Sequence, residues 1–212
     1  MTVVAFSDYG KRLISCTNDG LIKIWSVRDD IFRYVLPTKD MDETTLAIYS
    51  ATRSHIYTGF LSRTRLWDTN AGPLVASIIS HTSCLGGSLS LSPDEAAIAV
   101  FLDDNSVELV STKDRSLVAG PFRGHTQPAV SAPFSIDGAY LVTGPLNKSI
   151  RVWSIKDGRL AFGPFVGYAG RHRMVSLLSD CSRAISHTEY DGIRGWNLQD
   201  GILHADVRVH NS

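Results

Sequence analysis

The chain has 212 residues, 43% of them hydrophobic, and its 21 Lys and Arg residues balance its 21 Asp and Glu residues to a formal net charge of zero. This composition is typical of a globular protein with enough residues for a sizeable core. A neutral chain with no basic stripe and no polybasic tract argues against nucleic acid and membrane surfaces as partners.

The spacing of the tryptophans reveals an internal repeat of about 43 residues. Trp25, Trp67, Trp153 and Trp196 are separated by 42, 86 and 43 residues, so the middle interval is twice the others. The missing copy places Val110 at the tryptophan position. We therefore expect five copies in a single repeat region over residues 1–212, with boundaries near 1–42, 43–82, 83–125, 126–170 and 171–212.

Taken in chain order, every copy reads as short β-branched or alternating runs separated by turn residues, which is typical of strands. The first copy begins within a first strand. In the fourth copy, strands are predicted over residues 130–134, 140–143, 150–154 and 160–162, with turns at Asp137-Gly138, Asn147-Lys148 and Asp157-Gly158. In the fifth copy, residues 203–209 supply the last strand. The pattern predicts four antiparallel strands per copy and no helix.

The fourth copy carries a family resemblance. The residues that resemble a WD repeat are Gly124-His125, Phe134-Ser135, Asp137-Gly138, Thr143-Gly144 and Ile150-Arg151-Val152-Trp153. The resemblance covers essentially the whole chain and implies an all-β fold, a β-propeller of five four-stranded antiparallel blades. The segment from Gly120 to His125, Gly-Pro-Phe-Arg-Gly-His, also resembles repeats of fungal WD-repeat proteins, including those attached to NACHT-type nucleotide-binding switches.

The repeat register bears on whether such a propeller would close. His125 precedes Trp153 by 28 residues, so the equivalent residue of the first copy would fall before Met1. We therefore expect an incomplete, open part of a larger propeller, whose missing blades come from the same or another chain. Closure as a five-blade ring or through self-association is the alternative.

The WD resemblance also implies a buried hydrogen-bonded chain in each blade, formed by a His, a Ser or Thr, an Asp and the Trp. In the fourth copy these residues are His125, Thr143, Asn147 and Trp153, with Asn as a weaker acceptor than Asp. The first copy offers Ser15, Asp19 and Trp25. The fifth offers Ser186 and Trp196, with Tyr168 and Tyr190 at the His and Asp positions. We expect all of these residues to stabilise blades.

The two remaining copies depart further from the WD pattern. The third copy keeps Asp104 but has Val100 and Val110 at the Ser and Trp positions. The second keeps only Trp67, with Tyr57 and Leu61 at the other positions. We expect these two blades to depend on apolar packing.

Motifs of catalytic and nucleotide-binding chemistry are missing from the sequence. It contains no GxSxG, HExxH, GxxxxGK[ST] or GxGxxG pattern. We expect no enzyme activity, no cofactor and no metal. Cys16, Cys84 and Cys181 form no CxxC pair, which favours a reducing environment. Without a leader that resembles a signal peptide or an apolar stretch of ~20 residues, we expect an intracellular, cytoplasmic protein.

These observations favour a non-catalytic scaffold that binds proteins or peptides through loops, which rigid strands hold in place. The candidate binding residues are Arg63, Asn105, Lys148 and Tyr190 in the inner turns and Arg171 and His172 in the loop before the fifth copy. One alternative is the carboxy-terminal, ligand-sensing arm of a larger NACHT-type signalling ATPase. A more remote one is a propeller enzyme.

Overall fold

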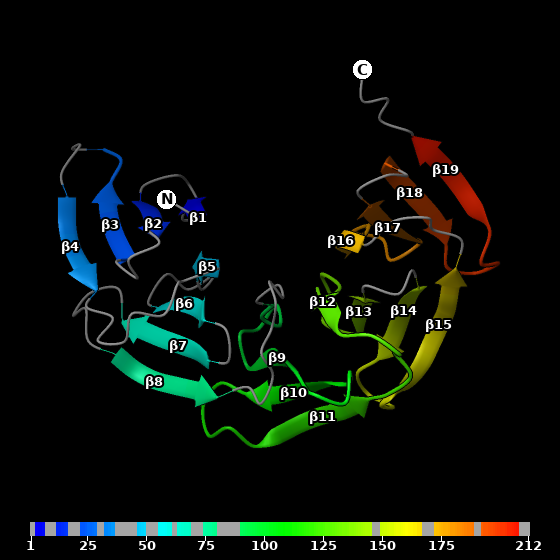
Figure 1. Ribbon diagram of the computed structural model, residues 1–212, viewed down its shortest axis with the longest axis horizontal. Coiled ribbons are helices and arrows are strands. Elements are labelled where there is room, and N and C mark those ends of the chain that lie inside the picture. The colour runs from blue at the N-terminus through cyan, green and yellow to red at the C-terminus, as the bar shows by residue number, and fades with distance from the viewer. Residues whose placement is uncertain are drawn as a thin grey trace. The chain divides into compact units, whose positions relative to one another are not determined.

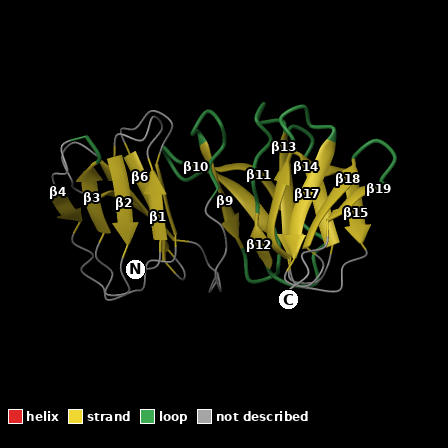
Figure 2. Cartoon of the chain, turned by 90° about the horizontal axis from the view of Figure 1, so that it is seen from above, coloured by secondary structure: helices red, strands yellow, loops and turns green. Residues whose placement is uncertain are grey.

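A computed structural model of the protein describes residues 3–6, 12–16, 22–28, 32–36, 46–49, 55–60, 63–68, 74–79, 90–145, 149–166, 172–188 and 192–207. Every regular element in these ranges is a β-strand (Figures 1 and 2). The prediction of an all-β fold is therefore confirmed. The chain divides into two compact units, Met1–Leu89 and Ser90–Ser212, which are described separately below.

The first unit contains two antiparallel sheets of four strands each. Strands that follow one another in the chain pair as neighbours, in the orders β1-β2-β3-β4 and β5-β6-β7-β8. We call these the first and second sheets. Their strands are β1 (Val3–Phe6), β2 (Arg12–Cys16), β3 (Ile22–Ser26), β4 (Phe32–Leu36), β5 (Leu46–Tyr49), β6 (His55–Phe60), β7 (Arg63–Asp68) and β8 (Leu74–Ile79).

The second unit contains three further sheets with the same up-and-down order. The third sheet has three described strands, and Leu91 forms an isolated bridge to Ile98 beside them. The fourth and fifth sheets have four strands each. The strands are β9 (Ala97–Phe101), β10 (Val107–Ser111), β11 (Leu117–Phe122), β12 (Ala129–Ser131), β13 (Tyr140–Pro145), β14 (Ser149–Ser154), β15 (Arg159–Val166), β16 (His172–Leu177), β17 (Arg183–Thr188), β18 (Gly192–Asn197) and β19 (Leu203–Val207).

The strand boundaries of the fourth sheet correct the sequence prediction at two places. The first strand stops at Ser131, and Phe134 keeps only an isolated bridge to Leu141, because Pro133 cannot donate to a ladder. The fourth strand continues to Val166 instead of ending at residue 162. The strand passes through Gly163-Pro164 with register shifts in its pairing to β14.

The core of the second unit includes the space between the fourth and fifth sheets. Val142, Ile150 and Val152 of the fourth sheet are fully buried and pack against Val175, Ala184 and Trp196 of the fifth. Because strand side chains alternate between faces, these residues lie on one face of each sheet. The small sheets bury their apolar faces against each other, as expected for stacked repeats.

Aromatic residues of β11 and β15 pack against the tryptophan of the following sheet. Phe122 lies 5.6 Å from Trp153, and Phe165 lies 5.8 Å from Trp196, measured between ring centroids. Both phenylalanines follow a Gly-Pro pair with a cis peptide bond. At Gly120 and Gly163, φ is positive and an added Cβ would lie within 2.9 Å of a carbonyl oxygen of the neighbouring strand, so only glycine fits.

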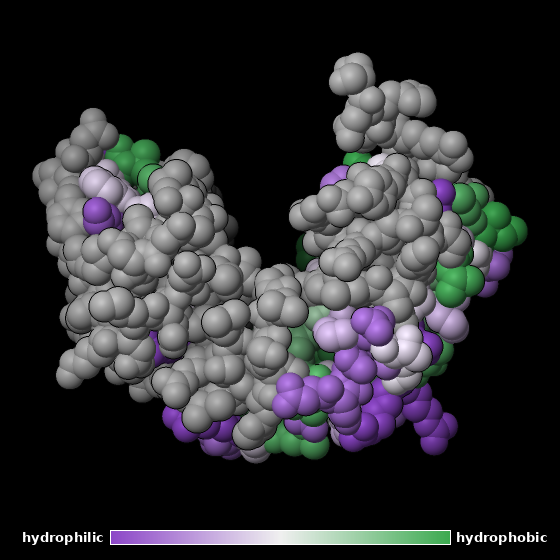
Figure 3. All heavy atoms as spheres, viewed as in Figure 1, coloured by the Kyte–Doolittle hydropathy of each residue, from purple (hydrophilic) through white to green (hydrophobic). Residues whose placement is uncertain are grey.

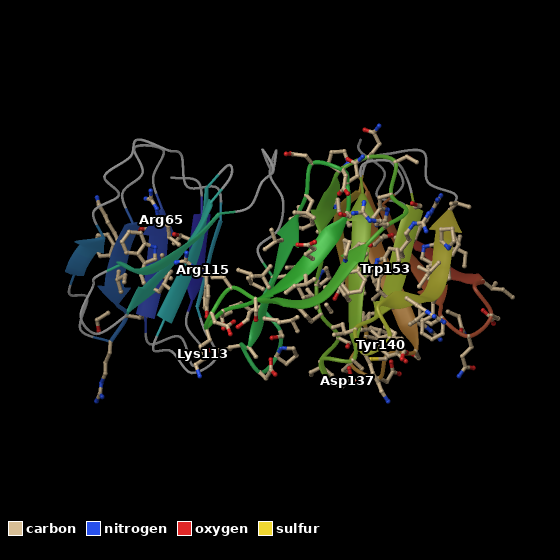
Figure 4. All side chains as sticks on the ribbon, turned by 90° about the horizontal axis from the view of Figure 1, so that it is seen from below. Arg65, Lys113, Arg115, Asp137, Tyr140 and Trp153 are labelled. Carbon is tan, nitrogen blue, oxygen red and sulfur yellow. The ribbon has the colours of Figure 1, made fainter. Side chains whose placement is uncertain are left out.

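The connections between the strands of the second unit lie at two opposite ends of its sheets. At its turn end lie the tight turns 92–96, 112–116, 135–139, 155–158, 178–182 and 198–202. At its loop end lie the turn 102–106 and the segment 123–128, which joins the third and fourth sheets. Figure 4 shows Asp137 at the turn end of the fourth sheet, with Tyr140 and Trp153 progressively farther from it.

Candidate functional site

The fourth sheet brings His125, Thr143 and Trp153 into one buried cluster. The indole Nε1–H of Trp153 donates a hydrogen bond of 2.7 Å to the Thr143 hydroxyl, and His125 Nε2 lies 2.6 Å from the same oxygen. All three side chains are at most 7% exposed. A hydroxyl accepts two hydrogen bonds and donates one, so Thr143 satisfies both partners at once. Asn147, the fourth member of the predicted chain, lies outside the described residues.

A similar hydrogen-bonded pair occurs in the first sheet. Trp25 Nε1 donates to Ser15 Oγ at 2.9 Å in the first sheet, whereas Asp19 lies outside the described residues. In the fifth sheet, Ser186 and Trp196 are both buried, on neighbouring strands β17 and β18. Tyr168 and Tyr190 also lie outside the described residues.

The second sheet corrects the predicted alignment by one residue. Trp67 Nε1 donates to Thr58 Oγ1 at 2.8 Å, so Thr58 and not Tyr57 takes the Ser or Thr position. The pairing of Phe60 with Arg63 leaves only two residues between β6 and β7. Three residues separate β13 from β14, so counting back from the tryptophan by a fixed number misplaces the acceptor. The prediction that this copy keeps only Trp67 of the polar pattern is therefore wrong.

In the third sheet, Asp104 interacts with a serine and an arginine. Asp104 accepts hydrogen bonds from the amide and hydroxyl of Ser106 and forms an ion pair with Arg123. These hydrogen bonds, and to a smaller extent Arg123, lower the pKa of Asp104 to about 2. Both charged side chains are exposed, and they connect the turn 102–106 with the segment 123–128 at the loop end.

The candidate binding residues fall at different places along the sheets. Asn105 lies in the turn between β9 and β10 with a positive φ of 64°. Arg63 and His172 were predicted in connecting segments but are the first residues of strands β7 and β16. These strands begin earlier than the turn residues indicated. Lys148, Arg171 and Tyr190 lie outside the described residues.

Cations on the third strands form a set that sequence reasoning missed. The residue two positions before each tryptophan is Lys23, Arg65, Arg151 or Arg194, and each pairs with the Ser or Thr of its sheet. Because residues two apart share a strand face, each cation lies on the tryptophan side. Arg65 and Arg194 are buried, and Arg151 is half-buried. The fixed spacing to tryptophan could have identified them.

Other chemistry is sparse in the described part of the chain. Within it, no group of three His, Cys, Asp or Glu residues could hold a metal ion. A cavity of about 640 Å³ lies at the turn end of the fourth sheet, away from the Thr143 cluster, and is lined by Tyr140, Ser154, Asp157, Arg159, Leu160 and Ala161. A membrane-spanning helix does not occur among the described residues either.

Two segments of the chain match a known family model. Residues 1–26 and 116–154 match the family model of the WD domain, G-beta repeat. The second segment includes His125, Thr143 and Trp153, and the first includes Ser15 and Trp25. No curated protein matches the chain. Repeats of this kind generally mediate contacts between proteins, and domains made of them are typically non-catalytic.

Proposed function

We propose that this chain, which belongs to the WD-repeat family, is a non-catalytic scaffold that binds another protein or a peptide at the loop end of its sheets. In this proposal, the sheets form blades whose polar repeat residues maintain the fold, and the connecting segments carry the binding side chains. Rigid strands commonly position binding loops in this way.

The observation that carries the proposal is the structural role of the Thr143 hydroxyl. The Thr143 hydroxyl is hydrogen-bonded to both Trp153 and His125 inside the blade. This hydroxyl is therefore buried and has no access to a substrate. A general base or nucleophile must instead reach a substrate. At the loop end, by contrast, Arg123 and Asp104 are exposed and available to a partner.

Cross-linking of the chain to its native partner tests the proposal. The complex is purified from cells under native conditions, treated with a carboxyl-to-amine cross-linker, and mapped by mass spectrometry. We expect links at the loop end through the carboxylates of Asp103 and Asp104 in the turn 102–106. Links confined to the turn end, for instance at Lys113, Asp137 or Lys156, would contradict the proposed binding surface.

A second candidate function is the ligand-sensing arm of a NACHT-type signalling ATPase. The observation that favours it is the Gly-Pro-Phe segment, which occurs at Gly120 and again at Gly163. In this version, the same loop end detects the ligand and further blades belong to the same chain. Sequencing of the native transcript tests it. In-frame repeats that lead upstream to a GxxxxGK[ST] motif support this version, and a stop codon directly upstream refutes it.

A further inference from the structure

The guanidinium of Arg151 is held in one place at the loop end of the fourth sheet. Its Cζ lies 5.9 Å from the centre of the Trp153 ring. The guanidinium also lies close to Gly124, where an added Cβ would lie 2.9 Å from an Nη nitrogen of Arg151. A cation over an indole face is attracted to the ring, and contact with a glycine leaves it little room to move. The charge is therefore positioned before any partner arrives.

This cation has no acidic partner among the described residues. Arg151 is half-buried, its Nε makes no hydrogen bond within the described part of the chain, and burial lowers its pKa. Taking a charge out of water without pairing it is unfavourable. Arg123, at the same end, differs because Asp104 already neutralises it.

The sequence around this position offers no carboxylate either. Segment 123–128 reads Arg-Gly-His-Thr-Gln-Pro, and the connection between β13 and β14 contains Leu146, Asn147 and Lys148. The connection from β15 to β16 reads Gly-Tyr-Ala-Gly-Arg. Asp103 and Asp104 belong to the turn of the preceding sheet. None of these three segments contains an Asp or Glu residue.

We propose that Arg151 binds a carboxylate side chain of an acidic peptide segment on the partner. This inference rests on the proposed function, because it names the chemistry that the loop end recognises. A planar guanidinium matches a carboxylate with two parallel hydrogen bonds. A polyanion such as nucleic acid fits less well, since the chain has no net positive charge and acidic Asp103 lies at the same end.

Binding of a fluorescein-labelled octaglutamate peptide tests the inference. Fluorescence anisotropy compares the unchanged chain with Arg151→Met, which keeps the stem over Trp153 and removes the charge. We expect Arg151→Met to weaken binding about tenfold or more, as for loss of a charged hydrogen bond. Arg151→Lys should be intermediate, because it keeps the charge and loses the fork. An octaglutamine peptide should not bind.

The matched control is Lys156→Met, which removes an exposed cation at the turn end of the same sheet. It should leave octaglutamate affinity nearly unchanged. Equal weakening by Lys156→Met and Arg151→Met would overturn the inference, because the effect would then come from the overall charge of the protein. Unchanged affinity in Arg151→Met would also overturn it. If Arg151→Met is unfolded by circular dichroism, Arg151→Lys decides: affinity equal to that of the unchanged chain contradicts the inference.

Two results separate this inference from the proposed function. If the native partner cross-links at the loop end but octaglutamate does not bind the unchanged chain, the acidic-peptide inference fails and the scaffold proposal stands. If octaglutamate binds through Arg151 but the native partner cross-links only at the turn end, the inference about Arg151 holds and the proposed binding surface is wrong.

Discussion

Phe122 at the end of β11 packs against Trp153 of β14, with 5.6 Å between ring centroids, and 43 residues later Phe165 packs against Trp196 at 5.8 Å, with the rings closer to parallel. In both pairs the phenylalanine precedes the tryptophan by 31 residues. Trp153 therefore has two partners: the Thr143 hydroxyl in its own sheet and the Phe122 ring of the preceding sheet. This contact joins consecutive sheets of the second unit.

The first prediction concerns that aromatic contact. Phe122 is fully buried, so Phe122→Ala removes a large apolar side chain and leaves a cavity beside Trp153. We expect the free energy of unfolding to fall by about 3–5 kcal/mol. Urea denaturation followed by tryptophan fluorescence measures it. Leu117→Ala on the same strand is the control, since Leu117 is 55% exposed and should matter little. If Phe122→Ala and Leu117→Ala lower the free energy of unfolding equally, the contact between Phe122 and Trp153 does not stabilise the protein as described.

The second prediction concerns the shared hydroxyl of Thr143. Thr143→Val keeps the shape but leaves the buried indole N–H of Trp153 without its acceptor. We expect a loss of about 1–3 kcal/mol in unfolding free energy. Thr143→Ser retains the hydroxyl and should lose less. If Thr143→Val and Thr143→Ser unfold at the same temperature, the hydrogen bonds of Thr143 do not contribute to the stability of the fold.

The third prediction uses the close contact between the fourth and fifth sheets at Gly144. A Cβ at Gly144 would lie 2.5 Å from Val175 Cγ1, so Gly144→Ala should destabilise the protein by about 1–3 kcal/mol. Val175→Ala alone also destabilises, by creating a cavity. The double variant should recover part of the loss, because one change makes room for the other. Strict additivity of the two effects in calorimetry would contradict this account.

The fourth prediction concerns a turn residue with an unfavourable backbone conformation. Arg115 has a φ of 65°, and Gly158 and Gly201 occupy the corresponding turns of the next two sheets. A left-handed conformation is unfavourable for residues with a Cβ. Arg115→Gly should therefore raise unfolding free energy by about 0.5–1 kcal/mol, after the greater freedom of glycine in the unfolded chain is deducted. A lower melting temperature would refute this.

The fifth prediction concerns stability at acid pH. The folded pKa of Asp104 is about 2, below its ordinary value of 3.8, chiefly because Ser106 donates hydrogen bonds to the carboxylate. A depressed pKa stabilises the fold above the unfolded value, and this contribution disappears as pH falls from about 4 to 2. The unchanged protein should melt at a higher temperature than Asp104→Asn near neutral pH, and this difference should shrink as the pH falls from about 4 to 2. A difference that stays constant from pH 6 to pH 2 would contradict the assignment.

The repeat allowed much of the fold to be predicted from sequence. Tryptophan spacing located the third strands, and turn pairs such as Asp137-Gly138 and Asp157-Gly158 fall in turns of the structure. The fourth strand of the fourth sheet was predicted too short, because a Gly-Pro pair usually ends a strand. Here the strand continues past Pro164 with register shifts. Local propensity does not encode such a continuation.

The contacts between sheets could not be predicted, because they depend on three-dimensional packing. Nothing in the sequence pairs Phe165 with Trp196 or Gly144 with Val175 before the sheets are stacked. The acceptor Thr58 was missed because a shorter connection shifts it by one residue relative to Trp67. In the sequence, Arg151 is recognised only as part of the repeat motif that ends at Trp153. Its proximity to Gly124 appears only in the structure. Figure 3 shows polar and apolar side chains interspersed on the described surface of the second unit, so surface composition alone does not locate the site.

Capture of the native partner by two matched sets of alanine variants tests the central claim most directly. One set changes Asn105 and Arg123, in connections at the loop end, and Lys148, which lies outside the described residues. The other changes Lys113, Lys156 and Arg183, which are exposed cations at or next to turns of the turn end. We predict that the first set loses partner capture, that the second retains it, and that every variant remains folded by circular dichroism. Loss of capture in the second set alone, or in both sets equally, would contradict the proposal that the loop end is the binding surface.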